Sequence, residues 1–477
     1  MPVNTPREEY TTYATIWQRM RDTFAGRDAI IKAGDLYTPT LPAATPTAQH
    51  AYLHRGNFYN AVRRTVSGLT GGVFQKTPRF DVPRRVQPWM DDVTLTGVPM
   101  SAFALAATEE VLLMGRTGAL VEMADSPLTE TRPYFVRYTT EQIINWDTTT
   151  LDGDEILTLL VLRESPRTVS DNDPFSYTAI EQYRELRLTE VEGSLRYTQQ
   201  VWQRPTGGGD VVRVGPVLTP LRRGEPLPFI PFVFFGPAFT TSALKDPPLL
   251  DLANLNLAHW RNSCDHEQGL HLVALPTPYV SGMKGAGEDS DVLHIGPSTI
   301  WILDKDGRAG MVEFSGAGMG ALEKALLAKQ HQMATLGAKL LEEQPTVAQE
   351  TATAVLARHA GEHATLRTLA QAMEQGLRTI LQTMAWWDGL ESQPRDVAVK
   401  VELNKDFLQI KSSPQEIQTA LATLQAGEIS YETFWHILTE GGWARYGITA
   451  EEEKREISRE PEQVPPPAEE VITVDEA

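Results

Sequence analysis

Cysteine is almost absent from this chain of 477 residues, because Cys264 is the only one. A single thiol cannot form an internal disulfide or supply a cluster that needs several thiolates. Long apolar runs are missing too, since no stretch reaches the roughly 18 residues that a membrane-spanning helix requires. The first 30 residues carry charged side chains where a secretion signal has an apolar core. We therefore expect a protein that is made in the cytoplasm and has no membrane partner.

Basic residues are fewer than acidic ones, 43 against 62, which gives a formal net charge of −19. A protein that wraps duplex DNA neutralises phosphates with Lys and Arg, so this balance argues against that class of protein. The charge is also uneven along the chain. Residues 1–90 have an excess of basic side chains, whereas the segment 451–477 is acidic and rich in proline. We expect this last segment to be a solvated tail.

Helical and strand-like patterns alternate along the chain and predict an α+β fold. Steps of three and four between apolar residues predict helices, and segments with a period of two predict strands. The expected helices of the first half are 10–30, 52–69 and 101–114, the last capped by Ser101 and ended by Gly115. The expected strands of the middle are 134–138, 156–163, 177–188, 195–203 and 229–235. Three long helices are then expected to begin near residues 250, 319 and 349.

The first and third of these long helices carry narrow apolar seams. The seam of the first consists of Leu250, Ala253, Leu257, Trp260 and Cys264, and that of the third of Leu366, Ala370, Met373, Leu377, Ile380 and Met384. Such seams are typical of helices that pack against long neighbours. We expect a ring of subunits to cover them, because one chain of this size would leave faces of these helices exposed. Gly361 and Gly376 are candidate kink points in the third helix.

One motif could carry catalysis. His359, Glu362 and His363 match the H-x-x-E-H pattern of inverted zinc proteases, in which two imidazoles on one helical face hold Zn²⁺ and the Glu activates its water. A third ligand would have to come from a distant residue such as Glu432 or Glu440. The competing interpretation is that both His residues continue the apolar seam and are packed. Walker A and nucleophile-elbow patterns are absent, so we expect a protein that is not an enzyme and has no cofactor.

Several phrases, in their order along the chain, resemble those of portal proteins, the head-to-tail connectors of tailed double-stranded DNA bacteriophages. The phrases are Phe58 to Asn60 continuing through Gly68 to Phe74, Glu141 to Trp146, Gln182 to Leu186, and Pro248 to His259. The order of helical, β-rich and long-helical segments is similar as well, over nearly the whole chain. The alternatives are the zinc metallopeptidase and another structural protein of the capsid or tail.

The resemblance implies a portal-like fold with a β-rich wing, long stem helices, a small β clip, a kinked helix and a short helical crown. The implied parts are the wing (1–245 and 390–410), the stem helices (246–274 and 316–341), the clip (275–315), the tunnel loop (342–350), the kinked helix (351–389), the crown (411–450) and the acidic Pro-rich tail (451–477). The tail is too acidic and Pro-rich to extend the crown into a long helical barrel.

The resemblance also implies partners. A ring of twelve subunits would sit at one capsid vertex of a virion assembled in the host cytoplasm. It would contact terminase, a tail adaptor protein and the major capsid or scaffold protein, and double-stranded DNA would pass through its channel during packaging and ejection.

Three groups of residues receive roles from this resemblance. Those assigned to the tunnel loop on the DNA channel are Glu342, Glu343, Gln344, Thr346 and Gln349, those assigned to the stem channel are Lys324, Lys329 and Lys339, and those assigned to the partner surface of the clip are Lys284, Trp301, Ile302, Lys305 and Arg308. The competing interpretations are a plain solvent turn at the tunnel loop, where Pro345 ends the preceding helix, and a core role for Trp301 and Ile302.

Overall fold

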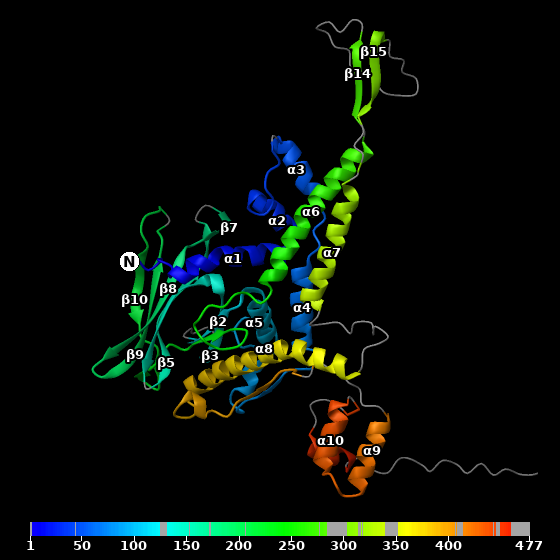
Figure 1. Cartoon of the computed structure of the whole chain (residues 1–477). Coiled ribbons are helices and arrows are strands. Elements are labelled where there is room, and N and C mark those ends of the chain that lie inside the picture. The colour runs from blue at the N-terminus through cyan, green and yellow to red at the C-terminus, as the bar shows by residue number, and fades with distance from the viewer. Residues whose placement is uncertain are drawn as a thin grey trace, which may run out of the picture.

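The structure is a computed structural model. It describes residues 2–42, 44–124, 131–151, 153–170, 173–205, 207–275, 277–283, 303–312, 316, 318–338, 352–405, 407, 414–441, 443–444 and 449–458. Helices and antiparallel sheets follow one another along the chain, so the prediction of an α+β fold is confirmed. We call α1–α5, β1–β13, α8 and β16 the body. We call α6, α7 and the β14–β15 hairpin the arm (Figure 1).

The helices of the first half surround the start of the arm. They are α1 (Glu8–Ala25), α2 (Arg27–Ala33), α3 (Pro46–Arg55), α4 (Ala61–Val73) and α5 (Met100–Met114). The single helix expected over 10–30 is wrong, because Gly26 adopts a φ of 101° and divides it into α1 and α2. Gly115 ends α5 in the left-handed conformation as expected, but the Ser101 cap is wrong, because Pro99 holds the N-cap position.

The strands of the body form two main sheets. The larger has the order β10-β9-β8-β5-β4 and the smaller the order β13-β2-β3. The strands of the body are β1 (Arg79–Asp81), β2 (Thr117–Met123), β3 (Pro133–Thr139), β4 (Ile143–Leu151), β5 (Asp154–Glu164), β6 (Arg167–Ser170), β7 (Asp173–Ala179), β8 (Gln182–Val191), β9 (Ser194–Gln203), β10 (Val212–Leu218), β11 (Leu221–Arg222), β12 (Glu225–Pro226), β13 (Phe232–Phe235) and β16 (Lys400–Glu402). The single strand expected over 177–188 is two strands, because β7 pairs with β6 and β8 joins the large sheet.

The second half of the chain consists of long helices and one hairpin. Its elements are α6 (Leu250–Ala274), β14 (Thr277–Met283), β15 (Leu303–Val312), α7 (Met319–Ala338), α8 (Ala352–Trp387), α9 (Pro414–Gln425), α10 (Tyr431–Glu440) and α11 (Ala450–Ile457). Figure 1 shows α8 lying across the base of the arm, with α9 and α10 beyond it. The helix α11 opens the segment that was expected to be a solvated tail, and its described side chains are mostly exposed.

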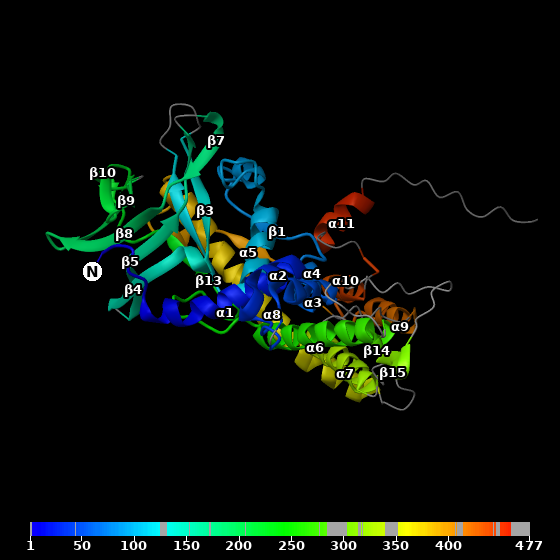
Figure 2. The same ribbon diagram turned by 90° about the horizontal axis from the view of Figure 1, so that it is seen from above.

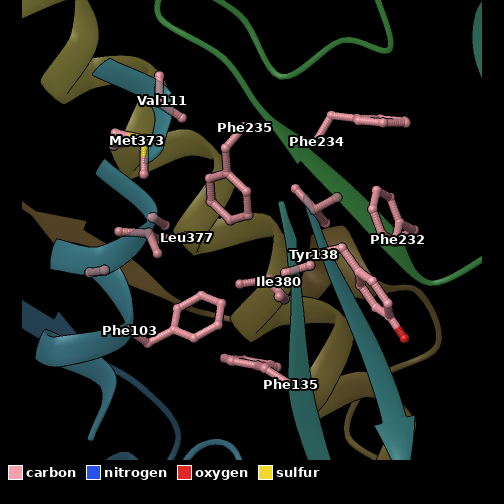
Figure 3. Close-up of a cluster of buried hydrophobic side chains, with 14 of the residues drawn as sticks. Phe103, Val111, Phe135, Tyr138, Phe232, Phe234, Phe235, Met373, Leu377 and Ile380 are labelled. Atoms are coloured by element: carbon pink, nitrogen blue, oxygen red, sulfur yellow. The ribbon is translucent and has the colours of Figure 1, made fainter. Parts of the chain in front are cut away.

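The main core lies where α8 crosses the small sheet and α5. The expected seam of α8 is buried here, and Met373, Leu377 and Ile380 are fully shielded from solvent (Figure 3). Gly376 serves this contact, because a Cβ at its position would lie 2.6 Å from the ring of Phe235 on β13. The helix is continuous through Gly376. The glycine therefore permits close approach of helix and sheet.

Two arginines of the β11–β12 turn hold the C-terminal end of α8. Arg222 donates from Nε to the Trp386 carbonyl at 2.6 Å and from Nη2 to the Leu390 carbonyl at 3.0 Å. Arg223 donates to the Gly389 carbonyl. The last carbonyls of a helix have no partner within the helix, and they carry partial negative charge. Arg222 satisfies one of them, that of Trp386, and the other bonds hold the chain just beyond the helix, so the end of α8 is fixed to the body.

Candidate functional site: a projecting arm

The arm is built from two helices that pack along each other and extend away from the body (Figures 1 and 2). The contact is close at Gly269, where a Cβ would lie 2.6 Å from Sδ of Met319. The hairpin continues from the far end of the pair. Its strands β14 and β15 are antiparallel, and Thr277 is opposite Val312. The geometry places a small β module at the tip of a helical pair.

The apolar seam of α6 is covered by helices of the same chain. Leu257, Trp260 and Cys264 form a cluster with buried residues of the N-terminal helices, which include Ile30 and Tyr52. The prediction that this face is buried is therefore confirmed. The expectation that a neighbouring subunit covers it is wrong, because α1–α4 occupy that position in the folded chain.

Hydrogen bonds fix this seam as well as apolar contacts. The buried Asn256 accepts from the amide of Ala61 at 3.0 Å and donates to the carbonyl of Tyr59 at 2.8 Å. Tyr52 donates to Asp265 at 2.7 Å, and burial followed by this bond raises the pKa of its hydroxyl. Burial raises the pKa of Cys264 to about 12, so this thiol is not an activated nucleophile.

His259 lies where the two arm helices meet the body. Its Nε2 is 3.2 Å from Nε2 of Gln330 on α7, and its ring lies beside that of Tyr59. Burial lowers the pKa of His259, and the positive charge of Lys329 lowers it further. The neutral imidazole is thus the form that fits this joint.

The arm exposes apolar side chains from its tip to its base. At the end of α6 these are Leu270, Leu272, Val273 and Leu275, on α7 they are Leu327 and Leu336, and on the hairpin they are Tyr279, Met311 and Val312. Leu270, Leu272 and Val273 point to different sides of α6, because each residue turns the helix by about 100°. Among the 20 residues of α7 only Glu323, Lys324 and Lys329 carry a full charge. Exposed apolar surface of this kind marks an interaction site.

Some of the residues predicted for the channel lie on α7. Lys324 is exposed, whereas Lys329 is half-buried beside His259. Lys339 and the five tunnel-loop residues (Glu342, Glu343, Gln344, Thr346 and Gln349) lie outside the described residues. The structure thus brings Lys329 to the joint between arm and body, a position that no sequence pattern predicted.

The residues predicted for the clip surface are divided in the same way. Lys305 and Arg308 are exposed on β15. Ser281 of β14 donates to the carbonyl of Arg308 at 3.3 Å, which fixes the backbone of this strand. Lys284, Trp301 and Ile302 lie outside the described residues, so the two interpretations of Trp301 and Ile302 stay predictions.

The zinc hypothesis is not tested by the structure. His359, Glu362 and His363 lie in α8, but their side chains are outside the described part. Within the described part of the chain, no group of three or more His, Cys, Asp or Glu residues is arranged to hold a metal ion. Among the described helices, none is both long and apolar enough to span a membrane.

Two charged features of the body were missed from the sequence. Arg21 of α1 pairs with Glu110 of α5 and, at 2.6 Å, with Glu141. Burial raises the pKa of Glu110, against the effect of Arg21. The other feature is Arg116, which is almost fully buried next to β2. Arg116 stands within an otherwise apolar segment, but this pattern does not identify what surrounds it.

Comparisons with known proteins match parts of this architecture. The family described as a domain of unknown function (DUF4055) matches residues 248–388, which include the arm and α8. No curated protein matches the chain.

Solved structures match most of the chain. One is a chain from the neck of an empty gene transfer agent particle computed with C6 symmetry, 12% identical, with a TM-score of 0.40 over 88% of this chain and 99% of that chain. Another comes from the virion of a native gene transfer agent particle, 13% identical, with a TM-score of 0.38 over 88% and 98%. A third comes from the neck of the native particle computed with C12 symmetry, 13% identical, with a TM-score of 0.38 over 84% and 95%.

This chain is similar to proteins of phage-like particles over most of its length. The resemblance noted in the sequence is confirmed to this extent.

Proposed function

We propose that this chain is the subunit of a portal ring, a homo-oligomer of about twelve copies at one vertex of a viral capsid. The observation that carries the proposal is the apolar outer arm. Leu327 on α7 is 58% exposed and Leu275 at the end of α6 is 61% exposed, although the body buries its own core. Subunits packed side by side would remove this surface from water, at roughly 25 cal/mol per Å² of apolar area.

A closed ring is the assembly that fits this surface. The apolar residues lie on several sides of the arm, so a neighbour on each side is needed to cover them. Contacts between unlike faces are heterologous, and they end either in a ring or in an open filament. A ring of arms would enclose a channel along its axis. The net charge of −19 per chain suits a conduit, because a wall that repels phosphates lets DNA slide.

The tunnel loop, residues 342–350, is proposed to line the narrowest part of this channel. In the sequence it lies between α7, which ends at Ala338, and α8, which begins at Ala352. Carboxylates of Glu342 and Glu343 repeated around an axis would concentrate negative potential on the DNA path. Replacing both by Lys is expected to leave the ring intact and to slow DNA translocation, more strongly at low salt. An unchanged packaging rate and salt dependence would remove the loop from the channel.

The hairpin is proposed to dock terminase during packaging and a tail adaptor protein afterwards. Its position at the tip of the arm makes it accessible when the arms are packed together. The triple variant Lys284→Glu, Lys305→Glu and Arg308→Glu should assemble normally but bind these partners less tightly. Pull-down of terminase with purified rings measures this. Equal recovery with the triple variant would exclude these side chains from the docking surface.

Mass measurement tests the ring itself. The subunit mass is 52.9 kDa, and native mass spectrometry at micromolar concentration is expected to give a species of about twelve times this value. Leu336→Asp should abolish the large species, because it places a charge in the apolar contact between arms. Leu151→Asp is the matched control, since both leucines are 46% exposed and Leu151 lies on β4 of the body. A protein that stays monomeric, or two variants with equal assembly, would contradict the ring.

A further inference from the structure

Arg116 is a charged side chain enclosed in the body without a counter-charge. It precedes β2, and only 1% of it is exposed. Its guanidinium lies 4.2 Å from the ring centroid of Trp146 and 5.3 Å from that of Phe234. Burial lowers the pKa of Arg116 to about 9, and the nearby charge of Arg7 adds to this effect. The site therefore disfavours the charged form that an arginine normally keeps.

The hydrogen-bonding capacity of Arg116 is largely unused by the described residues. Nη1 donates to the carbonyl of Ser242 at 3.0 Å. Nε and Nη2 are buried, and no described group accepts from them. No described carboxylate lies within 4.0 Å of the guanidinium. A buried cation with free donors is strongly unfavourable, so such a group calls for an anion or a water molecule as partner.

The charged groups near this guanidinium are also positive. Arg7 lies over the same Trp146 ring at 5.2 Å, and its own partner is Glu9, 2.7 Å away on the surface. Lys245 lines the same recess as Arg116. Arg116 has no counter-charge and Arg7 adds a second positive charge nearby, so the surroundings attract an anion and make an uncharged occupant less favourable.

We infer that Arg116 holds a small anion, a chloride ion or a single carboxylate oxygen, in the recess between the end of α5 and the loop 236–245. The lining of this recess includes Gly115, Phe239, Thr241 and Lys245. The free volume of the recess is about 10 Å³, which is room for one water-sized atom. A tetrahedral sulfonate is bulkier than a planar carboxylate, so it should fit this space less well. In the assembled particle, a carboxylate side chain of another copy of this chain could supply the carboxylate oxygen.

The position of this site gives the anion a structural role. The loop 236–245 leads from β13 to the start of α6, so it connects the small sheet to the arm. The close fit is visible at Gly115, where a Cβ would lie 2.7 Å from the carbonyl of Lys245. An anion bound by Arg116 on one side and by the loop on the other would hold this connection closed. The loop should then be better ordered in the presence of the anion.

Thermal unfolding of the full chain tests the inference. At constant ionic strength, replacing sodium isethionate, a bulky sulfonate, by sodium chloride or sodium acetate should raise the midpoint by about 2–4 °C. Arg116→Met should lose this response and keep an equal or higher midpoint in isethionate, because an apolar side chain can replace a buried charge. Arg213→Met is the matched control, since Arg213 lies 4.9 Å from the Trp202 ring but is exposed. It should respond like the unmodified chain.

Two further measurements remain informative if Arg116→Met does not fold. Trypsin should cleave after the exposed Lys245 several-fold more slowly in chloride or acetate than in isethionate, with cleavage after Lys305 on the hairpin as the internal control. A crystal grown in bromide should give an anomalous peak next to Nε of Arg116. A response to acetate but not to chloride would assign the site to a carboxylate oxygen. Equal midpoints and equal cleavage in all three salts would overturn the inference, and water would then be the partner of Arg116.

Discussion

The two apolar helices α7 and α8 have similar compositions but different surroundings. In α8 the seam from Leu366 to Met384 is covered by the small sheet, α4 and α5 of the same chain. In α7 Met333 is buried, but Leu327 and Leu336 are exposed. The core around α8 is therefore complete within one chain, whereas α7 leaves apolar side chains in water that another molecule could cover. The body also exposes apolar side chains, on β7 and β10, where Phe175 is 89% and Val217 is 55% exposed. We expect α8 to govern the stability of the monomer and α7 to contribute to assembly.

The largest expected effect comes from truncating one leucine in each helix. Leu377→Ala removes a fully buried side chain of α8, and it should lower the free energy of unfolding by about 2–5 kcal/mol. Leu327→Ala on α7 should change the free energy of unfolding of the monomer by less than about 0.5 kcal/mol, because the side chain is already in water. Chemical denaturation below the assembly concentration measures both values.

Assembly should rank the two leucine variants in the opposite order. Folded Leu377→Ala protein retains the arm surface, so it should still form the ring at a temperature where it is folded. Leu327→Ala should weaken the ring. If Leu327→Ala destabilised the monomer as much as Leu377→Ala, the contrast between arm and body would be wrong.

The sequence predicted which faces are buried better than what covers them. The seam of α6 was found from its spacing, because periodicity along one helix depends only on that helix. Its cover, the cluster around Ile30 and Tyr52, comes from a segment about 200 residues earlier, and no pattern in α6 identifies it. Periodicity also could not distinguish a cover within the chain from one in a neighbouring subunit. That is why the expected subunit contact at this seam was wrong.

Backbone breaks were predictable only in part. Gly115 was found because a glycine after an apolar helix is a common C-terminal signal. Gly26 was missed, since the apolar spacing continues across it from Phe24 to Ile30. Among the candidate site residues, Lys305 and Arg308 were expected on the hairpin and lie there. Arg116 could not be found, because its chemistry depends on Trp146 and Phe234, which are distant in sequence.

A second comparison uses the same glycine-to-alanine change in the two helices. At Gly376 of α8 the new Cβ would lie 2.6 Å from the ring of Phe235, so the change should cost about 1–3 kcal/mol. At Gly320 of α7 no atom lies within 4 Å, and alanine should stabilise by about 0.4–1 kcal/mol through the unfolded chain. Chemical denaturation of the two variants measures the sign of each change in the free energy of unfolding. If both variants were less stable than the unmodified chain, the start of α7 would be more tightly packed than the open space around Gly320 indicates.

A smaller effect is expected at the joint between arm and body. The pKa of His259 is held below its usual value of 6.5, so the unfolded state binds a proton more readily than the folded state. The contribution of His259 is therefore complete above about pH 6.5 and is lost as the pH falls through the folded pKa. The intrinsic rate of amide exchange falls on acidification, so the quantity to compare is the protection relative to that rate. The amides of Gln330 and its neighbours should lose protection as the pH falls.

Two substitutions separate His259 from other effects of acid. His259→Gln should remove the acid-induced loss of protection at the joint. His331→Gln is the control, because His331 lies one residue beyond Gln330 on α7 and is exposed. The same response to acid in all three proteins would exclude His259 as the group that titrates.

The smallest effect is expected at α11, which belongs to neither the body nor the arm and has contacts with α10. Its order depends on a local capping box, in which Thr449 Oγ1 accepts from the Glu452 amide at 3.2 Å and Glu452 accepts from the Thr449 amide at 2.9 Å. This backbone hydrogen bond, followed by that of the Thr449 hydroxyl, lowers the pKa of Glu452. The cap is therefore complete above the ordinary value of 4.5 and is lost as the pH falls through the lowered pKa.

Thr449→Ala should speed amide exchange in residues 450–457 and change the global free energy of unfolding by less than about 0.5 kcal/mol, whereas Thr449→Ser should restore protection. A global loss of stability in Thr449→Ala would mean that α11 is coupled to the body, and the division of the chain into self-sufficient and partner-dependent parts would then have to include its C-terminal helices.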